Sequence, residues 1–153
     1  MLKEGDNAPD VKLPLADGSS TSVAELAGKI LVLYFYPKDD TPGCTTEAQS
    51  FTALANDFAK AGASIIGVSK DSAARHQKFI GKYGLMVQLA SDEEGGICEA
   101  YGTWIEKTLY GRNYMGIDRA TFLIGRDGKI VRIWRKVKVK GHADEVLAAA
   151  KEL

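Results

Sequence analysis

The chain has 153 residues, 45% of them hydrophobic, which suits one compact domain with a sizeable core. Its 20 Lys and Arg residues balance its 20 Asp and Glu residues, and this neutrality gives no reason to expect binding to nucleic acid or to an anionic membrane. The sequence shows neither an apolar leader nor a run long enough to span a membrane, so we expect a cytoplasmic protein that does not bind a membrane.

Residues 1–29 are polar and rich in turns, and an Asp17-Gly18 turn predicts a small hairpin. We expect this segment to cover the core without being part of it. The run Ile30–Tyr36 is continuously apolar or aromatic and consists of strand formers, which is typical of a central strand covered on both faces. Pro37 then ends the strand, because it has no amide hydrogen to donate to a neighbouring strand.

A helix is predicted to begin at Pro42, with Thr41 as its N-cap, because proline suits the first helical position. Cys44 then lies in the first turn, where free amide hydrogens and the positive end of the helix dipole favour a thiolate. The residues expected to pack this helix on the sheet repeat at helical spacing: Cys44, Ala48, Phe51, Leu54, Ala55 and Phe58. We therefore expect a partly exposed thiol. The alternative is a small buried hydrophobe without a chemical role.

Strands and helices then alternate along the chain. Residues 64–69 are predicted to form a second buried strand, and the helix that follows is capped by Asp71 and ended by Gly84. A third strand is expected at residues 86–90. This alternation predicts a layered α/β domain.

The next helix is predicted to open at Ser91 or Asp92 and to carry Trp104 on its buried side. Cys98 lies one step off that side, so we expect a half-buried thiol there. Residues 106–118 are expected to be irregular, and a loop of this length often borders a functional site.

Residues 119–124 and 130–134 are predicted to be antiparallel neighbours, because the loop between them contains Asp127-Gly128, a strong hairpin signal. Asp144 is expected to start the last helix. The elements together predict one α/β domain over residues 1–153, with a mixed central sheet flanked by helices.

The two cysteines are expected to be reactive or inert thiols rather than a structural disulfide, because the cytoplasm keeps thiols reduced. Neither His76 nor His142 has a partner at metal-ligand spacing. We therefore expect no metal and no cofactor.

The residues Pro37, Thr41 and Cys44 match the peroxiredoxin pattern Pro-x-x-x-Thr/Ser-x-x-Cys, and the local sequence Pro-Lys-Asp-Asp-Thr-Pro-Gly-Cys-Thr-Thr-Glu resembles the bacterioferritin comigratory protein, or peroxiredoxin Q, branch. The likeness covers nearly the whole chain. Further segments that resemble this branch are residues 67–71, 110–111, 116–124 and 137–143. The resemblance implies a thioredoxin-like fold and a thiol-dependent peroxidase that reduces hydrogen peroxide and organic hydroperoxides.

The resemblance also implies catalytic roles for three residues. Cys44 would be the peroxidatic nucleophile, whose thiolate attacks one peroxide oxygen and becomes a sulfenic acid. The hydroxyl of Thr41 would bind the sulfur and the peroxide, although this residue could also be a plain N-cap. Arg119 would hold the thiolate ionised and stabilise charge on the departing oxygen.

Further residues would shape and support the site. Pro37 would shield the sulfur from water. The amides of Gly43 and Cys44 would donate to the peroxide oxygens, as helix N-termini do to anions. Glu47, one turn after the nucleophile, would orient Arg119, although an acidic residue suits a first helical turn without such a role.

Members of this branch carry a resolving cysteine five residues after the nucleophile or on the next helix, and these positions here are Gln49 and about Ile80. Cys98 is the remaining thiol, and a bond from it to Cys44 would need the two Cα atoms within ~7 Å. We therefore expect a one-cysteine cycle in which thioredoxin, glutaredoxin or a low-molecular-weight thiol reduces the Cys44 sulfenic acid. A two-cysteine cycle with Cys98 as the resolving thiol is the alternative.

Two other functions compete with the peroxidase. A thiol-disulfide oxidoreductase of the same fold would be expected to contain Cys-x-x-Cys, and the residues after Cys44 include no second cysteine at that spacing. A thioredoxin-like binding or chaperone module could use the basic segment 126–140, whose charges more simply form a solvated face. Leu109 and Tyr110 could support self-association, and we expect a monomer or a weak dimer.

Overall fold

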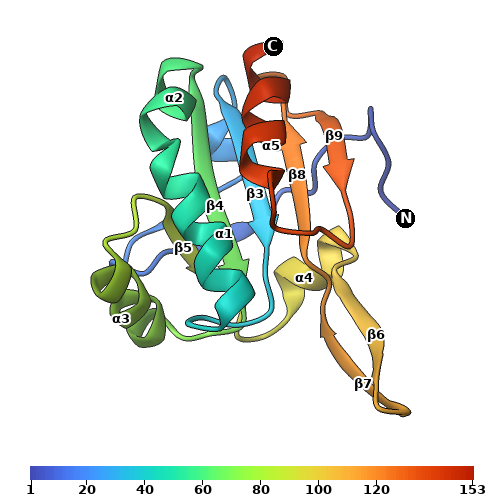
Figure 1. Ribbon diagram of the computed structural model, residues 1–153. Helices are drawn as coiled ribbons and strands as arrows, with labels where there is room; N and C mark the ends of the chain where they lie inside the picture. The colour runs from blue at the N-terminus through green and yellow to red at the C-terminus, as the bar shows by residue number, and fades with distance from the viewer.

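The computed structural model describes residues 1–153, and at its centre is a mixed sheet of five strands in the order β5-β4-β3-β8-β9 (Figure 1). β3, β4 and β5 are parallel, whereas β8 is antiparallel to β3 and β9 is antiparallel to β8. The strands are β3 (Ile30–Phe35), β4 (Ala63–Ser69), β5 (Gln88–Ser91), β8 (Ala120–Ile124) and β9 (Ile130–Trp134). The predicted mixed sheet is confirmed.

The central strand β3 is buried at every position, because other elements cover both faces of the sheet. Parallel pairing places Phe35 opposite Val68, close to the C-terminal end of β4. Antiparallel pairing places the same residue opposite Ala120, at the start of β8. Groups that follow β3 in the sequence therefore lie beside groups that precede β8.

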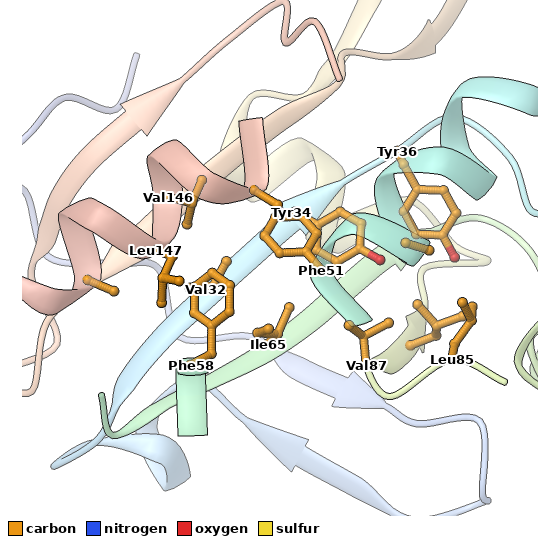
Figure 2. Close-up of a cluster of buried hydrophobic side chains, with 14 of the residues drawn as sticks. Val32, Tyr34, Tyr36, Phe51, Phe58, Ile65, Leu85, Val87, Val146 and Leu147 are labelled. Carbon is orange, nitrogen blue, oxygen red and sulfur yellow. The ribbon is translucent and has the colours of Figure 1, made fainter. Parts of the chain in front are cut away.

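Three helices cover one face of the sheet: α1 (Pro42–Ala53), α2 (Ala55–Lys60) and α5 (His142–Lys151) (Figure 1). Figure 2 shows part of the apolar cluster beneath them, in which Phe51 of α1 and Phe58 of α2 lie over β3 and Ile65 of β4. Cys44 belongs to this cluster. A break at Leu54 divides the helix that the apolar spacing predicts as one. α3 (Ala73–Tyr83) packs beside β5, at the edge of the same layer.

The opposite face is covered by α4 (Gly96–Tyr101), the short 3₁₀-helix η1 (Ala24–Leu26) and the hairpin of β1 (Lys12–Pro14) and β2 (Ser20–Ser22). The predicted hairpin around Asp17-Gly18 is confirmed. The expectation that residues 1–29 only cover the core is wrong. Leu13 is fully buried and, together with Val23, belongs to the apolar cluster on this face.

Two helices start at other residues than the sequence predicts. Asp71 does not cap α3, because Ser72 occupies the N-cap position and its hydroxyl accepts a hydrogen bond from the first turn. α5 begins at His142 rather than at Asp144, because Gly141 adopts a positive φ of 72° and turns the chain into the helix earlier. Both differences are local and leave the helices in the predicted layer.

α4 also begins later than predicted, at Gly96, but Asp92 still supports its first turn. The Asp92 carboxylate accepts hydrogen bonds from the backbone N–H groups of Ile97 (3.0 Å) and Cys98 (2.8 Å). Trp104 lies outside this helix, at the start of the next strand. No helix of the chain is both long and apolar enough to pass through a membrane.

The prediction of an irregular segment at 106–118 is wrong. These residues form most of an antiparallel hairpin of β6 (Trp104–Leu109) and β7 (Arg112–Ile117), which projects from the body of the molecule (Figure 1). Tyr110 and Gly111 make its turn with positive φ angles of 50° and 75°. Because most of the ribbon is exposed on both sides, no alternation of apolar and polar residues marks the two strands in the sequence.

Candidate active site

The first turn of α1 has unpaired backbone donors. Thr41 occupies the N-cap position with an extended backbone, and Pro42 is the first helical residue, as predicted. The Thr41 hydroxyl does not cap the helix, however, because it donates to the Lys38 carbonyl oxygen at 2.8 Å. The N–H groups of Gly43 and Cys44 therefore have no acceptor within the chain.

Cys44, Arg119 and Glu47 form a contiguous polar triplet on the inner side of this helix start. Nη2 of Arg119 donates to the Cys44 sulfur at 3.4 Å, and Nη1 donates to Oε1 of Glu47 at 2.7 Å. The pairing of β3 with β8 explains this contact, because Arg119 immediately precedes β8 and Cys44 lies a short loop beyond β3. The structure thus brings together three of the residues that the sequence resemblance singled out.

Gly43 contributes to the geometry of the site because it lacks a side chain. A Cβ atom at this position would lie 3.2 Å from Nη2 of Arg119, closer than most real Cβ contacts. The glycine therefore leaves room for the guanidinium next to the sulfur. The sequence suggested a role only for the amide of Gly43, because nothing in a single sequence reveals a close approach by a side chain 76 positions away.

Burial and charge act in opposite directions within the triplet. Burial raises the pKa of Glu47 to about 7, against the effect of Arg119, which favours the carboxylate. Burial also disfavours the charge on Arg119, but Glu47 and the Cys44 sulfur outweigh it and raise the pKa of the guanidinium. Arg119 therefore stays a cation, while the charge on Glu47 depends on pH near neutrality.

Cys44 is more deeply buried than predicted. Only 2% of the residue is exposed, so the expectation of a partly exposed thiol is wrong. Its side chain belongs to the apolar cluster that includes Ala48 and Phe51. Pro37, in contrast, is exposed at the start of the loop between β3 and α1.

Cys98 lies on the other side of the sheet. It is fully buried in the apolar cluster beneath α4, whereas Cys44 belongs to the cluster beneath α1. The expectation of a half-buried thiol is wrong, because the short α4 turns this position into the core. Burial, together with the neighbouring Asp92 carboxylate, raises the pKa of Cys98 to about 12. Both cysteines are free thiols.

The two histidines are buried and take part in hydrogen bonds. Nε2 of His142 lies 2.8 Å from the Thr121 hydroxyl, and burial lowers the pKa of His142 to about 4, so the ring is neutral. His76 pairs with Asp39 at 2.7 Å, an interaction that the sequence did not predict. Nowhere do three Asp, Glu, His or Cys side chains come together in a way that could hold a metal ion.

Comparisons with known proteins agree with this architecture. The AhpC/TSA family profile matches residues 4–133. Peroxiredoxin Bcp of Xanthomonas campestris pv. campestris is 51% identical over 142 residues, which are 93% of this chain and 89% of that protein. A mutant PrxQ from Xylella fastidiosa has a TM-score of 0.94 at 40% identity, over 99% of this chain and 97% of that one. A structure of the Xanthomonas campestris bacterioferritin comigratory protein, from work on its alkyl peroxide reduction activity, has a TM-score of 0.89 at 49% identity, over 93% and 90% of the two chains.

The fold and these matches define the class: the chain belongs to the AhpC/TSA family and has the thioredoxin-like fold of the peroxiredoxins. It is therefore an enzyme of the thiol-dependent peroxidase class. Within this family it is a member of the Bcp, or peroxiredoxin Q, branch. The family membership that the sequence motifs indicated is therefore confirmed.

Proposed function

We propose that Cys44 is the nucleophile of this peroxidase and that the enzyme reduces hydrogen peroxide and organic hydroperoxides through a Cys44 sulfenic acid. The observation that carries the proposal is the 3.4 Å contact between Nη2 of Arg119 and the Cys44 sulfur at the start of α1. A cation and a helix N-terminus both favour the thiolate. The alkyl peroxide reduction of the Xanthomonas campestris relative supports organic hydroperoxides as substrates.

In the proposed reaction the thiolate attacks the hydroxyl oxygen of the hydroperoxide. An S–O bond forms as the O–O bond breaks, the attacked oxygen keeps its hydrogen as the sulfenic acid, and the other oxygen leaves as an alkoxide or hydroxide that takes up a proton. Arg119 stabilises the charge that develops on the leaving oxygen. The free N–H groups of Gly43 and Cys44 donate to the peroxide oxygens. The Thr41 hydroxyl donates to a backbone carbonyl, so its lone pairs remain available to the peroxide O–H.

Two further residues have supporting roles in this proposal. Glu47 orients Arg119 through the 2.7 Å ion pair, which fixes the guanidinium relative to the sulfur. Pro37 lies exposed at the start of the loop between β3 and α1. Its proposed role, to limit the access of water to the sulfur, rests on the family resemblance alone.

We further propose that an external thiol regenerates the enzyme. A first thiol condenses with the sulfenic acid to give a mixed disulfide and water, and a second thiol displaces the Cys44 thiolate. Cys98 is an unsuitable resolving thiol, because it is buried beneath the opposite face of the sheet with its pKa raised to about 12. Gln49 and Ile80 offer no thiol. Thioredoxin, glutaredoxin or a low-molecular-weight thiol in the cytoplasm would serve as the reductant. We propose that the enzyme acts as a monomer or a weak dimer.

The test compares Cys44→Ser with Cys98→Ala in stopped-flow measurements of peroxide consumption, with dithiothreitol as the thiol. We expect Cys44→Ser to lose fast turnover and Cys98→Ala to retain it. In parallel, the wild-type thiols are mapped by mass spectrometry after one equivalent of hydrogen peroxide. Full activity of Cys44→Ser would refute the assignment of the nucleophile, and a Cys44–Cys98 disulfide in high yield would refute the one-cysteine cycle.

A further inference from the structure

The loop between β3 and α1 is anchored to α3 by a buried polar cluster that the proposed mechanism does not use. Oδ2 of Asp39 lies 2.7 Å from Nδ1 of His76, and Oδ1 of Asp39 accepts a hydrogen bond from the Tyr36 hydroxyl at 2.5 Å. His76 is fully buried and Asp39 nearly so. In Figure 2 the Tyr36 ring, whose hydroxyl makes this bond, lies well away from the α5 side chains Val146 and Leu147.

The hydrogen-bond partners determine where the protons of this cluster lie. Nε2 of His76 lies 3.0 Å from the Ala90 carbonyl oxygen, which can only accept, so Nε2 carries a hydrogen. Nδ1 faces Oδ2 of Asp39, and the other carboxyl oxygen of Asp39 already accepts a hydrogen bond from the Tyr36 hydroxyl. A proton must therefore lie between Nδ1 and Oδ2, so the two side chains share a hydrogen bond that is held out of water.

The same loop has further anchors on this side. The Asp39 N–H donates to Oδ2 of Asp71 at 2.8 Å. Asp40 adopts a positive φ of 58°, which is unusual for a residue other than glycine, and its carboxylate accepts hydrogen bonds from Lys82 (2.8 Å) and the Tyr83 hydroxyl (2.6 Å) on α3. Thr41 follows directly and is the N-cap residue of α1. The position of the helix start is therefore set by what holds residues 39 and 40.

The buried pair is the strongest of these anchors. The Asp40–Lys82 pair is exposed, and exposed ion pairs contribute little to stability. Removing one partner of a buried hydrogen bond leaves the polar atom of the other partner unsatisfied in the protein interior, which is unfavourable. The loop is therefore more tightly held at Asp39 than at Asp40.

We propose that Asp39 and His76 are positioning residues for peroxide reduction: their buried hydrogen bond fixes the loop against α3 and so holds Cys44 in register with Arg119. The inference rests on the proposed role of Cys44 as the nucleophile. Its physical basis is that a displacement of about 1 Å at a reacting group can cost about 100-fold in rate. Neither residue touches the peroxide or the sulfur in this mechanism.

The experiment measures the second-order rate constant of Cys44 with hydrogen peroxide, and the pH dependence of Cys44 alkylation by iodoacetamide, in a Cys98→Ala background. The variants are Asp39→Asn, His76→Gln and the double variant, with Lys78→Gln as the matched control. Lys78 is an exposed cation on α3, two residues from His76. We expect each single variant to react about 10- to 100-fold more slowly and its alkylation profile to move to higher pH, because the sulfur loses its alignment with Arg119 and the helix start.

Because the two side chains act as a unit, we expect the double variant to be no slower than the slower single variant, and Lys78→Gln to react like the parent protein. A merely structural role would lower the thermal midpoint without moving the alkylation profile. Folded single variants with parental rates and profiles would overturn the inference, as would losses that multiply in the double variant.

Tyr36→Phe provides a milder second variant, since it removes only the hydroxyl that donates to Asp39. We expect a several-fold slower reaction with an alkylation profile shifted in the same direction. Parental behaviour of this variant would overturn the inference even if the Asp39 and His76 variants did not fold. Failure of the proposed function is separately visible, because Cys44→Ser would then retain peroxidase activity.

Discussion

Gly43 shows at the scale of a single residue how a missing side chain shapes a site. Its helical backbone would accept alanine, but the added methyl group would lie 3.2 Å from Nη2 of Arg119. We expect Gly43→Ala to push the guanidinium a few tenths of an ångström from the sulfur and to slow the reaction with peroxide several-fold. Stopped-flow kinetics of Cys44 oxidation measures this effect.

Gly81 offers a matched control for that prediction. It lies inside α3, and a Cβ atom there would meet no other atom within 4 Å. We expect Gly81→Ala to stabilise the protein by about 0.5–1 kcal/mol in urea denaturation, through better helix propensity, and to leave the peroxide rate unchanged. A rate in Gly43→Ala equal to that of Gly81→Ala would show that the space beside Arg119 has no effect on the reaction.

Glu47 couples stability to pH. Burial raises its pKa from 4.5 to about 7, so the native protein holds the proton more tightly than the unfolded chain does. The stabilisation that this binding contributes is complete below pH 4.5 and is lost as the pH rises through about 7. One carboxylate oxygen, Oε2, is buried without a hydrogen-bond partner, which adds to the cost of the ionised form.

We therefore expect Glu47→Gln to gain stability relative to wild type as the pH rises. The glutamine cannot ionise, so the difference in unfolding free energy should move in its favour by up to about 3 kcal/mol between about pH 4 and about pH 8. Urea denaturation at both pH values measures this difference. A difference that stays constant over this range would contradict the raised pKa of Glu47.

Some of these residues could be inferred from the sequence and others could not. The local motif around Cys44 and the whole-chain resemblance were enough to single out Arg119 and Glu47. In the structure Arg119 contacts the sulfur, and Glu47 contacts Arg119. The Asp39–His76 pair was missed, because acids are common in turns and histidines are common on helices without any such partner. Only the register between distant elements reveals that they meet.

At the scale of elements, α4 depends on a residue outside its own bounds. The helix has six residues, too few to be stable alone, and the buried Asp92 carboxylate holds its first turn through two backbone hydrogen bonds. Cys98 is one of the two donors. The accessibility of this thiol therefore depends on the cap.

We expect Asp92→Ala to destabilise the protein by about 2 kcal/mol, because it leaves two buried N–H groups without an acceptor. We also expect Cys98 to react faster with a thiol reagent in a Cys44→Ser background, since the first turn of α4 opens more readily. The control is Glu93→Ala, whose side chain is exposed next to Asp92. Equal reactivity of Cys98 in the two variants would show that the Asp92 cap does not control the accessibility of this thiol.

The elements themselves were predictable to different degrees. The buried strands stood out because a short, continuous run of apolar strand formers between turn residues is typical of a covered strand, as Ile30–Phe35 shows. Helix starts were less certain: Gly141 begins α5 earlier than Asp144 suggested, through a backbone conformation that composition does not reveal. The β6–β7 hairpin was missed because its strands are held by each other rather than by the core.

At the scale of the whole molecule, the sheet separates the two thiols into different apolar clusters. A sulfenic acid at Cys44 therefore has no partner cysteine within the folded chain. We expect excess hydrogen peroxide without added thiol to carry Cys44 to the sulfinic or sulfonic acid while Cys98 stays a thiol, as seen by peptide mass spectrometry. Added dithiothreitol should protect Cys44, and protection without any thiol would contradict the absence of an internal partner.

The pairing of β3 with both β4 and β8 has a consequence for the newly made protein. Cys44 and the arginine that contacts it are 75 positions apart, so the cysteine leaves the ribosome well before its cation exists. Until β8 docks, the sulfur lacks its contact with Arg119. In the mechanism proposed above, the sulfur gains its full reactivity towards peroxide only when β8 places Arg119 beside it, which spares the nascent chain from oxidation at this site.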